Sequence, residues 1–101
     1  MSAKRSTLYA TTDAPVALTT VYTSTGNTHF DKATVLNDTG GAITLDVTIA
    51  GIPVYAAYSV AAATEAESLD HIVNHGMDAG EVIQVNASAA NLNMLISGRD
   101  F

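Results

Sequence analysis

The clearest pattern in the chain is the strict alternation of apolar and polar side chains from Ile43 to Ile49. Successive side chains of a β-strand point to opposite faces of the sheet, so this segment places branched aliphatic residues on one face and Thr-Asp-Thr on the other. A strand with one apolar and one polar face is typical of an antiparallel sheet that is wet on one side. The preceding Gly40-Gly41 pair indicates a turn.

Short runs of strand-forming residues recur along the rest of the chain. Turn formers separate them at residues 25–27, 37–41, 51–53, 75–80 and 88–91. We expect seven short strands, at residues 16–23, 28–37, 42–50, 53–61, 68–74, 81–88 and 92–98. Strands of this length and spacing favour a β-sandwich or a small barrel. The expected fold is therefore all-β, a single antiparallel β-sandwich or jelly-roll-like domain.

Two segments leave alternatives open. Residues 61–67 are rich in Ala and Glu, which favour helix, so one helical turn between the sheets is an alternative to a loop. In the strand at residues 81–88, Val82, Ile83 and Val85 are apolar and only Gln84 interrupts them. Such a strand is either covered on both faces, by a loop or a neighbouring subunit, or an ordinary interior strand.

The amino-terminal residues 1–14 are rich in Ser, Thr and Ala and end at the punctuation Asp13-Ala14-Pro15. We expect them to form an extended N-terminal arm, followed by the β-sandwich domain at residues 15–101. Such an arm reaches up to about 45 Å, far enough to contact a neighbouring protomer. Its start lacks the apolar core of a secretory signal, and no run is long enough to span a membrane. A soluble protein without membrane contact is expected.

Composition narrows the possible functions. A chain of 101 residues favours one domain with one thin core, which leaves little room for an enclosed active site. Ten acidic residues against four basic ones give a net charge of -6, and Lys32 and Arg99 are the only basic residues after the arm. Too few cations remain to neutralise a row of phosphates, so no direct binding of nucleic acid is expected. The absence of Cys excludes disulfides, thiol catalysis and cysteine metal sites.

The three histidines do not predict a metal site. His71 and His75 are four residues apart in an expected strand, which would separate them by about 13 Å. His29 is far away in the sequence. Asp70 and His71 form an adjacent acid and base, but neighbouring strand residues face opposite ways. No metal ligand is therefore assigned.

Catalytic patterns are also absent from the sequence. No Ser lies in a Gly-x-Ser-x-Gly elbow, and Gly40-Gly41 precedes a strand where a phosphate-binding loop would precede a helix. Glu65 and Glu67 are a possible acid and base pair, yet no Trp is present to form a platform for a sugar. We expect no catalytic residue, no cofactor and no enzymatic activity.

Five apolar or aromatic residues are candidates for an interface. Leu8 and Tyr9 project from the expected arm, and Tyr55 and Tyr58 are expected on opposite faces of one strand. Phe101 ends the chain. Aromatic residues are enriched at protein interfaces, so we expect these side chains to anchor the protein on neighbouring subunits.

The same turn and strand frame resembles small β-sandwich proteins in the virions of tailed bacteriophages. The resemblance extends over residues 16–98 and rests on the segments 21–23 (VYT), 33–39 (ATVLNDT), 43–47 (ITLDV), 78–85 (DAGEVIQV) and 96–98 (ISG). The chain departs from the family pattern at residues 55–67, where Ala and Tyr replace a more regular polar connection. These motifs recur among head decoration, neck or collar, and tail or fibre proteins.

The resemblance implies a non-enzymatic virion structural protein that is made in the host cytoplasm, self-associates and packs on a larger assembly. Decoration or stabilisation of the capsid is the first expectation, with the protein itself and the major capsid protein as partners. A neck, collar or tail component is the alternative within this class. A carbohydrate-binding or receptor-binding β-sandwich module is the alternative outside it, and the small number of aromatic residues disfavours it.

Overall fold

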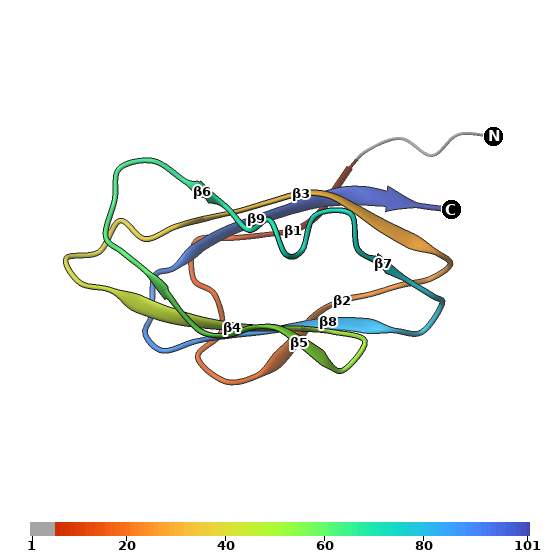
Figure 1. Cartoon of the computed structure of the whole chain (residues 1–101), viewed down its shortest axis with the longest axis horizontal. Coiled ribbons are helices and arrows are strands. Elements are labelled where there is room, and N and C mark those ends of the chain that lie inside the picture. The colour runs from red at the N-terminus through yellow and green to blue at the C-terminus, as the bar shows by residue number, and fades with distance from the viewer. Residues whose placement is uncertain (1–5) are drawn as a thin grey trace.

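The computed structural model describes residues 6–101 and confirms an all-β fold built from two packed antiparallel sheets (Figure 1). The strands are β1 (Ser6–Thr11), β2 (Thr19–Thr23), β3 (Thr28–Leu36), β4 (Ile43–Ile49), β5 (Ile52–Val60), β6 (Glu67–Ser68), β7 (Gly76–Met77), β8 (Val82–Ala87) and β9 (Asn93–Asp100). Within residues 6–101 there is no helix that is long and apolar enough to cross a membrane.

The two sheets, here called A and B, are built from strands that are distant in the sequence. Sheet A has the order β1-β9-β3, and the short strands β6 and β7 both pair with the remaining edge of β3. Sheet B has the order β2-β8-β4-β5. Figure 1 shows sheet A as the upper layer and sheet B as the lower layer. The chain therefore crosses repeatedly between the layers, which makes the fold a β-sandwich.

The core lies between the sheets and follows the alternation seen in the sequence. The inward side chains of β4 are buried, whereas Thr44, Asp46 and Thr48 lie on the outer face of sheet B. Strand β8 contributes Ile83 and Val85 to the core and lies between β2 and β4. It is thus an ordinary interior strand of the sandwich.

The expected boundary of the N-terminal arm at residue 14 is wrong for its described part. Residues 6–11 form β1, which pairs with β9, and residues 1–5 lie outside the described residues. Ala14 is fully buried, and its backbone N–H donates to the carbonyl of Leu92 at 2.9 Å. The alternation of side chains that marks a strand is interrupted here, because β1 carries an extra residue at Leu8 relative to β9. The sandwich therefore begins by residue 6.

The strand expected at residues 68–74 is also wrong. Only Glu67–Ser68 pairs with β3, and the following residues form a turn in which the N–H of Ile72 donates to the carbonyl of Leu69 at 3.0 Å. Leu69 and Ile72 are both fully buried. A turn brings two apolar residues three positions apart onto the core, whereas a strand would point them to opposite faces.

The Ala-rich segment 61–66 is an exposed loop without helical structure. A short helical turn costs more backbone entropy than its few hydrogen bonds return, and this segment has no apolar face to bury. The loop is held by the N–H of Ala63, which donates to the carbonyl of Asn37 at 2.8 Å. At the end of the loop, Ala66 lies on the outer surface of sheet A.

Candidate functional site

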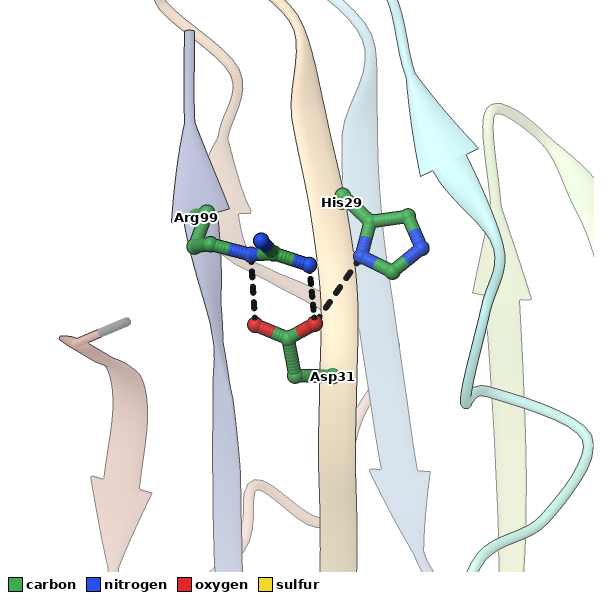
Figure 2. A network of polar contacts seen from close by, with 3 residues as sticks. All are labelled: His29, Asp31 and Arg99. Carbon is green, nitrogen blue, oxygen red and sulfur yellow. Dashed lines mark hydrogen bonds and ion pairs between the residues drawn. The ribbon is translucent and has the colours of Figure 1, made fainter. Parts of the chain in front are cut away.

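A polar network on the outer face of sheet A joins β3 to β9. Strand β3 has one extra residue, Asp31, between the pairs that Phe30 and Lys32 make with β9. Arg99 grips the Asp31 carboxylate with two hydrogen bonds, from Nε at 3.0 Å and from Nη2 at 2.9 Å. His29 Nδ1 lies 3.0 Å from the same carboxylate (Figure 2). The bulge in β3 thus directs the Asp31 carboxylate toward the guanidinium of Arg99 on the neighbouring strand β9.

The geometry of the network favours a structural role. The side chain of Asp31 is 5% exposed, so the carboxylate has little surface on which to meet a substrate. Within residues 6–101 the hydrogen-bond partner of the His29 ring is Asp31, and a nucleophile beside the imidazole would be needed for covalent catalysis. The fork of Arg99 is engaged by Asp31. The network therefore holds the two strands together next to the bulge.

Sequence reasoning missed this network. His29 and Asp31 are two residues apart, a spacing that indicates a shared strand face, but Arg99 is 68 residues from Asp31. Only the pairing of β3 with β9 brings the guanidinium to the carboxylate. The charge types alone gave no signal for this partnership.

The other histidines lie in or beside the turn that replaced the expected strand. His71 and His75 are both exposed, and the ring of His71 packs edge-on against Tyr55 at 5.4 Å. The described part of the chain contains no group of three or more His, Asp or Glu side chains that could hold a metal ion.

Tyr55 and Tyr58 close one side of the sandwich. Their ring centroids are 4.9 Å apart, so the expectation that they lie on opposite faces of a strand is wrong. Between them β5 has one residue more than β4, and Ala57 adopts a positive φ of 51°. This bulge turns both rings inward. Tyr55 is buried and accepts a hydrogen bond from the backbone N–H of His71 at 3.1 Å.

Tyr58 connects β5 of sheet B to sheet A. Its hydroxyl donates a hydrogen bond to the carboxylate of Glu67 in β6. This hydrogen bond raises the pKa of Tyr58, and burial raises the pKa further. Tyr55 and Tyr58 thus link β5 to the segment that covers the edge of β3. Both candidates make contacts within their own chain.

The remaining interface candidates differ in exposure. Leu8 and Tyr9 are half-buried and pack against the protein's own core, and burial raises the pKa of Tyr9. Phe101 is 64% exposed. Its backbone N–H donates to the carbonyl of Asn27 at 2.7 Å, and its ring lies 5.9 Å from the guanidinium carbon of Arg99. Phe101 is therefore the most solvent-accessible of the five candidates.

The carboxyl end of β9 is fixed to sheet B by a second polar network. Asp100 accepts hydrogen bonds from the hydroxyl of Tyr22 in β2 and from Thr28 Oγ1, the latter at 2.5 Å. The hydroxyls of Thr28 and Ser24 are 2.7 Å apart. Burial raises the pKa of Tyr22, and the hydrogen bond to Asp100 adds to the increase. This network links the two sheets at one end of the sandwich.

The outer face of sheet B is polar and satisfied by its own contacts. Gln84 Nε2 donates to Thr20 Oγ1 at 3.2 Å, and Thr48 Oγ1 donates to Gln84 Oε1 at 3.4 Å. Asn86 Nδ2 donates to Asp46 Oδ2 at 3.2 Å. This face has the character expected of a surface that remains in water.

The outer face of sheet A, by contrast, contains an apolar groove with a volume of about 630 Å³. It opens to solvent where β1, β9 and β3 lie side by side, and Leu95 stands at its centre between Ala10 and Thr34. Its apolar lining is supplied by Ala10, Leu36, Ala66, Met94 and Leu95. Leu95 is 45% exposed. The groove thus places a partly exposed leucine in the middle of the outer face of sheet A.

One feature of the sequence indicates this groove, namely a break in the alternation of apolar and polar residues near the end of the chain. Met94, Leu95 and Ile96 are three successive apolar residues within one strand. Since Met94 and Ile96 are buried in the core, strand geometry forces Leu95 onto the outer face. Only the pairing of β9 with its two neighbours adds the rest of the lining.

The chain matches no known protein family, no curated protein and no solved structure. Its function must therefore be inferred from the chemistry of the surfaces described above.

Proposed function

We propose that this chain is a non-enzymatic structural protein of a tailed-bacteriophage virion, which self-associates and packs on the capsid to decorate or stabilise it. The observation that carries the proposal is the open apolar groove on the outer face of sheet A, centred on Leu95. An apolar groove that opens to solvent is suited to contact another protein surface. The resemblance of the sequence to virion proteins is the reason for proposing a virion as the larger assembly.

The charge distribution supports the same face as the contact surface. Lys32 and Arg99, the basic residues of the described chain, both lie on sheet A. Lys32 is exposed and precedes Thr34 and Leu36 on the groove's own strand. Since Arg99 is paired with Asp31, Lys32 is the basic residue within residues 6–101 that would attract a carboxylate of a partner to this face. The matching surface on the capsid would combine apolar side chains with carboxylates.

The same groove would serve a neck, collar or tail component equally well. The two locations differ in which virion protein covers Leu95, so the choice is made by testing capsids and tails separately. Capsid decoration is tested first because it is the leading expectation from the resemblance.

A matched pair of substitutions tests the groove. Leu95→Asp places a carboxylate in the groove, and Ile52→Asp places one at another exposed aliphatic residue, which is 65% exposed in β5. We expect the wild-type protein and Ile52→Asp to sediment with capsids assembled from the major capsid protein of the same phage. Leu95→Asp should bind at least about tenfold more weakly, a loss of about 1.4 kcal/mol.

Two results would contradict this proposal. Equal binding by all three proteins would remove the groove as the contact surface. Absence of binding by the wild type to capsids and to tails would remove the proposed role itself.

A further inference from the structure

One long side of the sandwich is built from a single continuous stretch of chain, residues 6–23. It comprises β1, the connection that follows, and β2. Strand β1 is the outermost strand of sheet A, and β2 is the outermost strand of sheet B. Within residues 6–101 neither strand has a second strand partner, so each presents free backbone N–H and C=O groups along one edge.

The opposite side of the sandwich is closed by the chain itself. There β6 and β7 cover the edge of β3. The edge strand β5 contains Pro53, which has no N–H to donate. A proline in an edge strand hinders pairing with another chain, whereas bulges occur in β1, β2 and β5 alike and do not distinguish the two sides. The two sides therefore differ in their capacity to accept a further strand.

The side formed by residues 6–23 is also almost free of charge. Asp13 is its one charged residue, and its carboxylate accepts a hydrogen bond from the N–H of Asn91 at 3.0 Å. The other nine of the ten acidic residues lie in residues 24–101. Two copies of a chain with a net charge of -6 repel one another, and residues 6–23 contribute one of the ten carboxylates to that repulsion.

Apolar side chains on this side add area that a partner would bury. Val16 is 62% exposed and Leu18 is 52% exposed, and both belong to the connection between β1 and β2. Tyr9 in β1 and Tyr22 in β2 are half-buried and pack against the core. Val16 and Leu18 are thus the exposed large apolar side chains of residues 6–23 that a partner would bury.

From these observations we infer that residues 6–23 form the interface between two copies of this chain. The copies meet side to side around a two-fold axis, and β1 of one copy pairs antiparallel with β1 of the other. Val16 and Leu18 are covered as the sides come together. The inference rests on the self-association in the proposed function, and it is tested without capsids so that dimer loss and loss of capsid binding are separate results.

The test is the mass of the intact protein in solution, measured by light scattering over a range of concentrations. Ala10 in β1 and Ala56 in β5 are both exposed alanines in edge strands, on opposite sides of the sandwich. We expect a dimer for the wild type and for Ala56→Glu. Ala10→Glu and Thr19→Glu, the latter in β2 outside the groove, should each weaken dimerisation at least about tenfold.

Three results would overturn the inference. A wild type that remains monomeric at every concentration excludes the interface. Loss of the dimer in Ala56→Glu to the same degree as in Ala10→Glu moves the interface elsewhere. Weakening by Ala10→Glu without any weakening by Thr19→Glu assigns the contact to the groove.

Hydrogen exchange of the wild type gives a second readout that requires no variant to fold. Raising the protein concentration should slow exchange of the amides in β1 and β2 and leave those of β5 unchanged. Exchange in β1 that is independent of concentration, while the mass shows a dimer, would overturn the inference.

Discussion

Replacing Gly98 with alanine is expected to destabilise the fold by about 3 kcal/mol or more, since forced overpacking costs about 1–3 kcal/mol and exceeds this range when backbone must move. A Cβ at this position would lie 2.3 Å from the carbonyl oxygen of His29 and 2.9 Å from Leu8 Cδ1. Gly98 pairs with Ser6 and with Phe30 in the middle of sheet A. Relief of the clash would therefore pull β9 away from β3.

The measurement is urea unfolding, with Gly40→Ala as the matched control. A Cβ at Gly40 meets nothing within 4 Å, so this control should change the free energy of unfolding little. Equal unfolding midpoints for Gly98→Ala and Gly40→Ala would show that the close contact of β9 with β3 is not as described.

Replacing Asn37 with alanine should cost about 3 kcal/mol, because a net hydrogen bond contributes about 0.5–1.5 kcal/mol and buried groups left unpaired cost more. The side chain is 1% exposed. Its Nδ2 donates to the carbonyls of Gly41 at 2.7 Å and Val60 at 2.9 Å. Its Oδ1 accepts from the N–H of Thr39 at 3.1 Å. One amide thus joins the turn before β4 to the end of β5.

Asn27→Ala provides the comparison for this second substitution. Asn27 is exposed, and its backbone exchanges hydrogen bonds with Phe101. Thermal and urea unfolding should show a large loss for Asn37→Ala and a change within about 0.5 kcal/mol for Asn27→Ala. A loss of similar size in both variants would contradict the role assigned to the buried amide.

The regular strands could be predicted from the sequence because their alternation is unbroken. Strand β4 begins and ends within one residue of the expected segment, and its apolar residues face the core. Alternation failed as a guide where a strand contains an extra residue. Bulges at Leu8 and near Ala57 shift the pattern, and neither is marked by a glycine. For this reason alternation alone predicts an arm where β1 lies and predicts opposite faces for Tyr55 and Tyr58.

The candidate surfaces were less accessible to sequence reasoning than the strands. The groove requires Ala10, Leu95 and Thr34 to lie in one row across three strands, and sheet order supplies that row. The contact of Arg99 with Asp31 likewise depends on the pairing of β9 with β3. The periodicity of apolar residues does not reveal which distant strands pair with one another.

The two proposed contacts are geometrically compatible. Antiparallel pairing of two β1 strands in one continuous sheet places the two-fold axis perpendicular to the sheet. The outer faces of both copies of sheet A then point in the same direction, and the two grooves can engage one capsid surface together. Two linked weak contacts of this type bind more tightly than either alone.

The decisive experiment for a structural role in the virion is the protein composition of purified particles, determined by mass spectrometry with quantification against the major capsid protein. We expect this chain to be an abundant component of intact particles and to remain with emptied capsids after tails are removed. Recovery of the chain only in the soluble fraction of the infected-cell lysate would contradict a structural role in the virion.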